Sequence, residues 1–175
     1  MYYGAIKKYD IANGLGVRVS LFVSGCTHKC KGCFNPETWD FNYGTLYTHE
    51  TQLEIIDALN HPYIAGLTLI GGEPLEPSNQ RILVELVKAV KQQFPEKNIW
   101  CYTGYNFEND IISSEGCARC EVTGELLSYI DILVDGEFQI DRKNISLKFR
   151  GSENQHIILV QESLKQAKTI LSELN

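Results

Sequence analysis

A closely spaced set of three cysteines constrains this chain more than any other feature. Cys26, Cys30 and Cys33 follow the spacing C-x3-C-x2-C within one short loop. Thiolates are soft ligands that select iron–sulfur clusters, zinc or copper(I). A 4Fe–4S cluster normally takes four cysteines, so three leave one iron without a protein ligand and able to bind a substrate. The three cysteines are therefore predicted to bind one 4Fe–4S cluster with an open iron.

A structural zinc site is the main alternative, because zinc takes four ligands, usually in two separated pairs. His28 lies inside the loop and is not expected to turn toward the same metal as its neighbours. A distant fourth ligand could come from Cys101, Cys117 or Cys120. Disulfides are not expected, since the chain starts with a mixed polar segment and not with a signal peptide. The cluster is favoured, and zinc stays open.

Composition narrows the class of protein. The chain has 175 residues, 43% of them hydrophobic, and is predicted to form a single domain over 1–175. A chain of this length buries about 70% of its unfolded surface without disulfides. The balance of 16 basic and 22 acidic residues gives a net charge of −6, which argues against nucleic-acid binding. No apolar run approaches the ~20 residues of a membrane helix, so we expect a cytoplasmic protein.

Strands alternate with helices along the chain, which implies an α/β fold with βαβ units around a mostly parallel sheet. Thr48 and Ser78 are the predicted N-caps of the first two helices. The cysteine loop directly follows a predicted strand, and open α/β folds bind ligands at the carboxyl ends of their strands. Strands are predicted over 2–8, 17–23, 66–70, 98–103, 131–135 and 156–160, and helices over 49–60, over 79–93 and from about 162.

Each predicted helix carries apolar residues at helical spacing, which indicates the face that it buries. The predicted stripes are Leu53, Ile56 and Leu59 on the first helix, Leu83, Leu86, Val87 and Val90 on the second, and Leu164, Ala167, Leu171 and Leu174 on the last.

A second candidate site is the turn Gly71-Gly72-Glu73-Pro74, which follows a predicted strand. Glycines let the backbone approach a ligand closely, and Pro74 restricts Glu73 to an extended conformation. Such a turn offers acceptors but few donors, so it suits an ammonium group. An ordinary strand-to-helix turn is the equally simple alternative.

At these residues the sequence resembles a known family. C-x3-C-x2-C after a strand is similar to the signature of radical S-adenosylmethionine enzymes, and 71–74 resembles their G-G-E motif. The stretches 21–26 and 33–39 resemble one branch, the activating proteins of anaerobic ribonucleoside-triphosphate reductase. Like that branch, the chain has Gly32 before the third cysteine and the aromatic Phe34 after it. A late element, Arg150-Gly151-Ser152-Glu153-Asn154-Gln155, is also similar to the branch.

The resemblance, which runs from about residue 10 to about residue 160, carries several implications. It implies a short partial (β/α) barrel that binds S-adenosylmethionine beside the cluster, cleaves it reductively and generates a glycyl radical on the reductase. No catalytic side chain is needed beyond the cluster ligands, and the implied electron donor is a reduced flavoprotein. The residues implied to bind the cofactor are Gly32, Cys33, Phe34, Gly71, Gly72, Glu73 and Pro74.

Two other functions stay open: a radical enzyme acting on a small molecule, and a zinc-binding interaction module without catalysis. The pair Cys117 and Cys120, a C-x2-C in the polar loop 113–121, departs from the family pattern. That spacing is typical of half a metal site or of a redox dithiol, and a variable loop is the equal alternative. We expect neither cysteine to bind the catalytic cluster.

Overall fold

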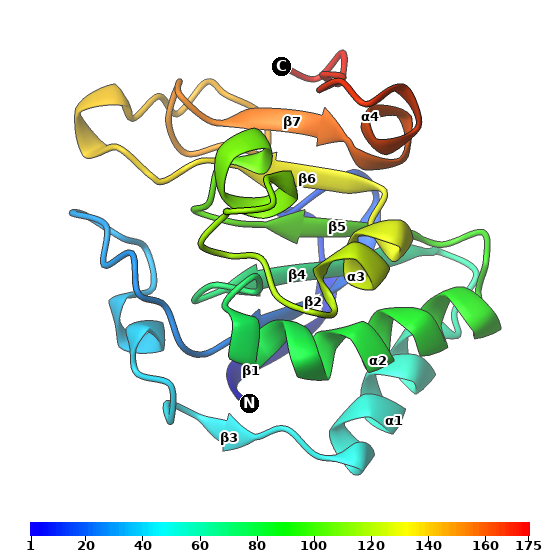
Figure 1. The fold of residues 1–175 in the computed structure, drawn as a ribbon. Helices are drawn as coiled ribbons and strands as arrows, with labels where there is room; N and C mark the ends of the chain where they lie inside the picture. Colours follow the sequence, from blue (N-terminus) through cyan, green and yellow to red (C-terminus); the bar gives the residue numbers. More distant parts are fainter.

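The computed structural model describes residues 1–175, which form one seven-stranded sheet in the order β3-β1-β2-β4-β5-β6-β7 (Figure 1). The strands are β1 (Tyr2–Asp10), β2 (Val17–Val23), β3 (Thr45–Leu46), β4 (Ile64–Gly71), β5 (Asn98–Tyr102), β6 (Ile132–Asp135) and β7 (His156–Leu159). The helices are α1 (His49–Leu59), α2 (Pro77–Gln93), α3 (Thr123–Tyr129) and α4 (Val160–Gln166), with short turns η1 (Pro36–Trp39), η2 (Phe107–Ile112) and η3 (Ile140–Arg142).

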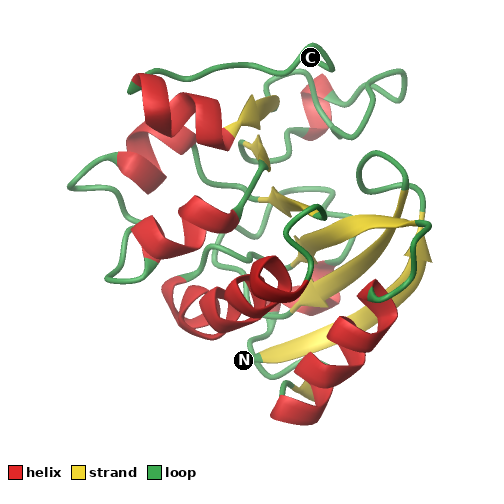
Figure 2. Ribbon diagram, turned by 90° about the vertical axis from the view of Figure 1, so that its right-hand side faces the viewer, coloured by secondary structure: helices red, strands yellow, loops and turns green.

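The centre of the sheet is parallel and its margins are antiparallel. Strands β2, β4, β5 and β6 pair in parallel, and β1 and β7 pair antiparallel on either side of them. Strand β3 pairs antiparallel with β1 and so runs in the direction of the central strands. The predicted α/β fold with a mostly parallel sheet is confirmed. The sheet is open, so its strands do not close into a barrel (Figure 2).

Helices cover one face of the sheet. One cluster of 28 buried residues joins α1, α2 and α3 to alternate residues of the strands, among them Leu21, Leu69 and Ile99. The intervening strand residues point to the opposite face, as the pleat requires. There a smaller cluster of Trp100, Val134 and Ile157 packs under the loop that carries Phe149.

The predicted N-cap of α1 is confirmed, but its predicted buried face is only partly correct. The hydroxyl of Thr48 accepts a hydrogen bond from the backbone N–H of Thr51, and the two side chains form a capping box. Leu59 is buried as predicted. Leu53 is 53% exposed, and its predicted burial is wrong because α1 turns the side of Ile55 and Ala58 toward the sheet.

The second helix buries Leu83, Leu86, Val87 and Val90, as predicted. The predicted cap at Ser78 is wrong. The helix begins at Pro77, and Glu76 occupies the N-cap position without a side-chain cap bond. Proline suits the first helical position, since its backbone angle is already helical and it needs no N–H there.

The last helix is much shorter than the predicted stripe, and it buries Val160 and Ser163 while Leu164 is 41% exposed, so the predicted stripe is wrong. The helix ends at Gln166, and Ala167 adopts a left-handed conformation with φ of 49°. The chain then turns back along β7, where the N–H of Leu159 donates to Ile170 and that of Ser172 donates to Ile157. These bonds cover the outer edge of the sheet. No helix of the structure is long and apolar enough to cross a membrane.

Candidate functional site

Four chain segments meet at the carboxyl edge of the central parallel strands, because parallel strands end on the same side of a sheet. The cysteine loop follows β2, the turn that begins at Gly71 follows β4, Thr103 and Gly104 follow β5, and Gly136 follows β6. All four segments line one pocket, the thiol pocket hereafter. The two sites found separately in the sequence are therefore one site.

The three predicted ligands all line the thiol pocket. Cys26 is 7% exposed, and Cys30 and Cys33 are half-buried. The loop turns between them through Lys29 and Gly32, whose φ angles of 51° and 76° are left-handed. Burial raises the pKa of Cys26 to about 11 and that of Cys30 to about 12. In the metal-free chain these groups are thiols, so metal binding releases protons.

The donor set fits a cluster better than a single ion. No three His, Cys, Asp or Glu side chains gather as they would around one metal ion. Cys26, Cys30 and Cys33 instead share one pocket without converging on a single point. A 4Fe–4S cluster takes its thiolates at separate iron corners, so this arrangement suits it.

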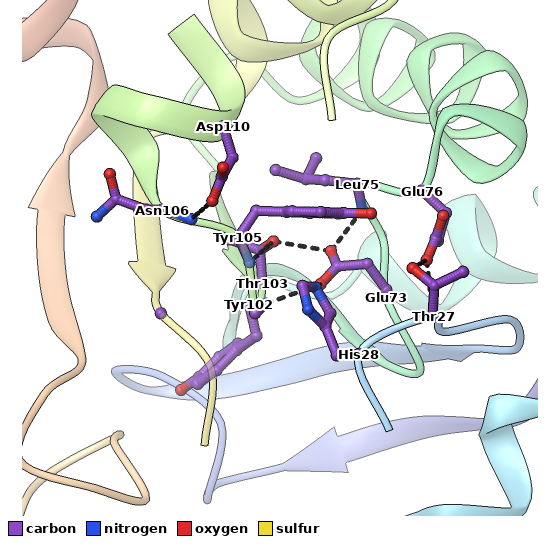
Figure 3. Close-up of polar contacts among 12 residues, drawn as sticks. Thr27, His28, Glu73, Leu75, Glu76, Tyr102, Thr103, Tyr105, Asn106 and Asp110 are labelled. Carbon is purple, nitrogen blue, oxygen red and sulfur yellow. Dashed lines mark hydrogen bonds and ion pairs between the residues drawn. The ribbon is translucent and has the colours of Figure 1, made fainter. Parts of the chain in front are cut away.

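Glu73 lines the thiol pocket, and its carboxylate accepts hydrogen bonds from several segments of the chain. Its side chain is 1% exposed. One carboxylate oxygen accepts from the N–H of Leu75 and the hydroxyl of Thr103, both at 2.8 Å. The other accepts from the N–H of Gly104 at 2.7 Å and contacts Nε2 of His28 at 3.1 Å (Figure 3). The carboxylate therefore joins the segments that follow β2, β4 and β5, and Glu73 remains part of the pocket lining.

His28 lines the thiol pocket, and its Nε2 contacts this carboxylate. Burial lowers the pKa of His28, but the hydrogen bond and the charge of Glu73 outweigh it, so the pKa lies above its ordinary value. The ring also lies 4.4 Å, centroid to centroid, from that of Tyr105. The expectation that His28 does not share a metal with its neighbours agrees with this geometry.

Gly71 and Gly72 line the pocket, and both lie against the strand that precedes the cysteine loop. The N–H of Gly72 donates to Val23 at 2.7 Å. A Cβ at Gly72 would lie 2.7 Å from the carbonyl oxygen of Gly25 and 2.8 Å from that of Thr38. A side chain at this position would displace the root of the cysteine loop, so the glycine is needed for this close approach.

Among the other predicted cofactor residues, Phe34 lines the pocket and is 63% exposed. Gly32 and Pro74 do not line it. Gly32 is exposed at the loop surface, and a Cβ there would lie 3.0 Å from Ile140. Pro74 is buried behind the turn. The left-handed φ of 76° at Gly32 lets the loop turn there.

Trp39 and Phe138 complete the pocket wall, and neither was among the predicted site residues. They come from segments without regular patterns, η1 and the loop after β6, so no periodicity in the sequence could reveal them. Gln155, from the late element, also lines the pocket. Its amide donates to Gly136 at 2.9 Å and accepts from Gly151 at 2.8 Å. The late element therefore reaches the site through this glutamine.

A second pocket adjoins the first and shares the side chains of Phe34, Tyr102 and Phe138 with it. It extends over the helix-free face of the sheet toward Phe149 and Arg150. The hydroxyl of Tyr102 is buried between the two pockets and has no hydrogen-bond partner. Together the pockets form a continuous, largely aromatic site that reaches the molecular surface at Phe34.

The remaining cysteines lie outside both pockets. Cys101 is fully buried in the core. Cys117 is exposed, with its Sγ 3.5 Å from a carboxylate oxygen of Asp110, and Cys120 faces Gln80 at 3.5 Å. None of the three lines the thiol pocket as a fourth ligand would, which counts against the zinc alternative.

Comparison with known proteins agrees with this site. The model of a 4Fe-4S single cluster domain matches residues 12–158. The anaerobic ribonucleoside-triphosphate reductase-activating protein of Enterobacteria phage T4 is 45% identical over 159 residues, 90% of this chain and 93% of its own. The proteins of the same name from Pasteurella multocida and Escherichia coli K12 are 42% and 40% identical. The alignment with the Pasteurella protein covers 90% of this chain, and that with the Escherichia protein covers 89%. Each alignment covers 96% of the relative's own length.

Proposed function

Because the chain belongs to the family of anaerobic ribonucleoside-triphosphate reductase-activating proteins, we propose that it activates such a reductase by generating a glycyl radical on it. The observation that carries the proposal is the union of three thiols and a Gly-Gly turn in one pocket at the carboxyl edge of a parallel sheet. A molecule bound to an open iron of the cluster would share this pocket with the Gly-Gly turn.

The roles of the residues follow from where they lie. Cys26, Cys30 and Cys33 hold the 4Fe–4S cluster, and the backbone of Gly71 and Gly72 receives the amino-acid end of S-adenosylmethionine. When both are bound they supply radical chemistry, in which one-electron reduction cleaves S-adenosylmethionine and a hydrogen atom is then taken from a glycine of the reductase. The aromatic wall excludes water from that step. No side chain of the chain acts as an acid or base.

The fold is a short version of the partial (β/α) barrel of radical S-adenosylmethionine enzymes, in which 1–175 act as a single domain. The open, mostly parallel sheet with its ligand edge at the strand ends supports this. We place the protein in the cytoplasm, where a reduced flavoprotein supplies the electron.

A macromolecular substrate is supported by the form of the site. Phe34 lines both pockets and is 63% exposed, so the wall between them reaches the surface. A peptide segment of the reductase can enter beside the cofactors there, and the reductase supplies the missing walls. A small metabolite would need a more enclosed site with several convergent polar groups.

The test mixes the reconstituted, reduced protein with S-adenosylmethionine and the anaerobic reductase under strict exclusion of oxygen. Electron paramagnetic resonance should then detect a glycyl radical on the reductase, and omission of S-adenosylmethionine should abolish it. Absence of that signal, together with sustained S-adenosylmethionine cleavage on a small metabolite, would transfer the function to the small-molecule alternative.

A further inference from the structure

We propose that Thr27 and His28, which lie between the first two cysteines, are positioning residues that hold the cysteine loop in its ligand-binding shape before the cluster is present. They do so by hydrogen bonds to two buried carboxylates, those of Glu73 and Glu76. The proposal rests on the proposed cluster site and assigns a purpose to residues that contact no metal.

Thr27 carries the first pair of bonds. Its backbone N–H donates to Oε1 of Glu76 at 2.8 Å, and its hydroxyl donates to the same oxygen at 2.6 Å. Glu76 is 6% exposed and occupies the N-cap position of α2, so its backbone is fixed by the start of a long helix. The residue next to Cys26 is thereby tied to a rigid element (Figure 3).

His28 carries the second bond, from its Nε2 to Oε2 of Glu73 at 3.1 Å. A carboxylate can only accept here, so the imidazole donates. That carboxylate is itself held by the N–H groups of Leu75 and Gly104 and by the hydroxyl of Thr103. The loop is therefore attached to the ends of both β4 and β5 through one side chain.

The site is also shaped around the imidazole. A Cβ at Gly104 would lie 2.7 Å from both Cδ2 and Nε2 of His28, so only glycine leaves room for the ring. The ring of Tyr105 closes the other side at 4.4 Å between centroids. A slot built from a glycine, an aromatic ring and a buried carboxylate is specific for the position of His28.

Between Cys30 and Cys33 the loop has one backbone hydrogen bond of its own, from the N–H of Cys33 to the carbonyl of Cys30 at 3.1 Å. Lys29 and Lys31 are exposed, and Lys29 adopts a left-handed conformation that costs free energy in a residue with a side chain. Fixing such a backbone is entropically costly. With two of the three residues between Cys26 and Cys30 tethered, the loop is held in one shape, so that cluster assembly starts from an ordered loop.

The experiment compares His28→Ala and His28→Gln in the metal-free protein by hydrogen exchange of the amides in 26–35. The alanine variant should exchange about tenfold faster, which corresponds to the loss of one hydrogen bond to a charged group. The glutamine amide can place an N–H near the imidazole Nε2, so this variant should recover most of the protection. His61→Ala, which removes an exposed ring stacked on Tyr63, is the matched control and should leave the loop unchanged.

A second measurement follows cluster assembly with limiting iron and sulfide. Assembly on the alanine variant should be slowed to a similar extent, again with recovery by glutamine, while thermal unfolding confirms that each variant is folded. Thr27→Val keeps the backbone bond and loses only the hydroxyl bond, so its effect on exchange should be smaller, about threefold.

If folded His28→Ala shows the same amide protection in the loop and the same rate of cluster assembly as the parent, the proposal is wrong. It is also wrong if His28→Gln recovers no more protection than His28→Ala. These readouts need no reductase. A protected loop and normal assembly in the parent, without any glycyl radical on the reductase, would instead count against the proposed function alone.

Discussion

Cys30 offers the most direct test at the scale of single residues, because it is the central member of the three-thiol set. Replacing it with alanine leaves two thiols in the pocket, which is too few to hold a cluster with one open iron. Cys30→Ala should therefore lose its 4Fe–4S content after anaerobic reconstitution and should no longer cleave S-adenosylmethionine. Iron and sulfide analysis with electron paramagnetic resonance measures both. Cleavage at the parental rate would refute the assignment.

Cys117→Ala is the matched control, since it removes an exposed thiol outside the pocket. It should retain the cluster and its activity. Loss of the catalytic cluster in this variant, or in the double variant with Cys120→Ala, would show that the C-x2-C pair belongs to the site. Loss of a different metal with unchanged activity would show a separate site.

The start of each long helix provides a test at the scale of the elements. Thr48→Ala removes the side-chain cap of α1 and should lower the free energy of unfolding by about 1 kcal/mol. Ser78→Ala alters an exposed residue inside the first turn of α2 that caps nothing, so the change should stay below about 0.5 kcal/mol. Urea denaturation of the metal-free protein measures both. A larger loss for Ser78→Ala would contradict the observed start of α2.

A buried arginine is the test at the scale of the whole molecule. Arg18 is 0% exposed, and burial lowers its pKa to about 10. Its Nε donates to Thr68 at 2.7 Å, and its terminal nitrogens donate to Leu15, Leu67 and Asn98 at 2.8–3.1 Å. One side chain thus joins the turn before β2 to β4 and β5.

Arg18→Ala should lower the free energy of unfolding by about 3 kcal/mol or more, because it leaves several buried acceptors without a donor. Arg119→Ala removes an exposed arginine that donates only to Ile112 and should change stability little. Urea denaturation compares the two variants. Equal, small effects would mean that the network around Arg18 does not contribute to holding the sheet together.

The strands were the most predictable elements, since the alternation of apolar with polar residues and the β-branched residues indicate them within a short stretch of sequence. Strand β2 matches its predicted bounds, the five other predicted strands differ by up to two residues at either end, and the two-residue β3 was not predicted. The segment between Asn106 and Ile130, which forms η2 and α3, was not predicted to be regular. Its short helices depend on packing against the core through Phe107 and Leu126, which no local pattern records.

The sequence by itself determined the chemistry of the site, because the spacing of Cys26, Cys30 and Cys33 and the Gly-Gly-Glu-Pro turn are local properties of the chain. Only the tertiary structure decided that these two segments share one pocket and that the carboxylate of Glu73 contacts His28 there. The physical reason is that the direction of a buried carboxylate depends on its hydrogen-bond donors. Here those donors come from β5 and from the cysteine loop, 30 and 45 residues away along the chain.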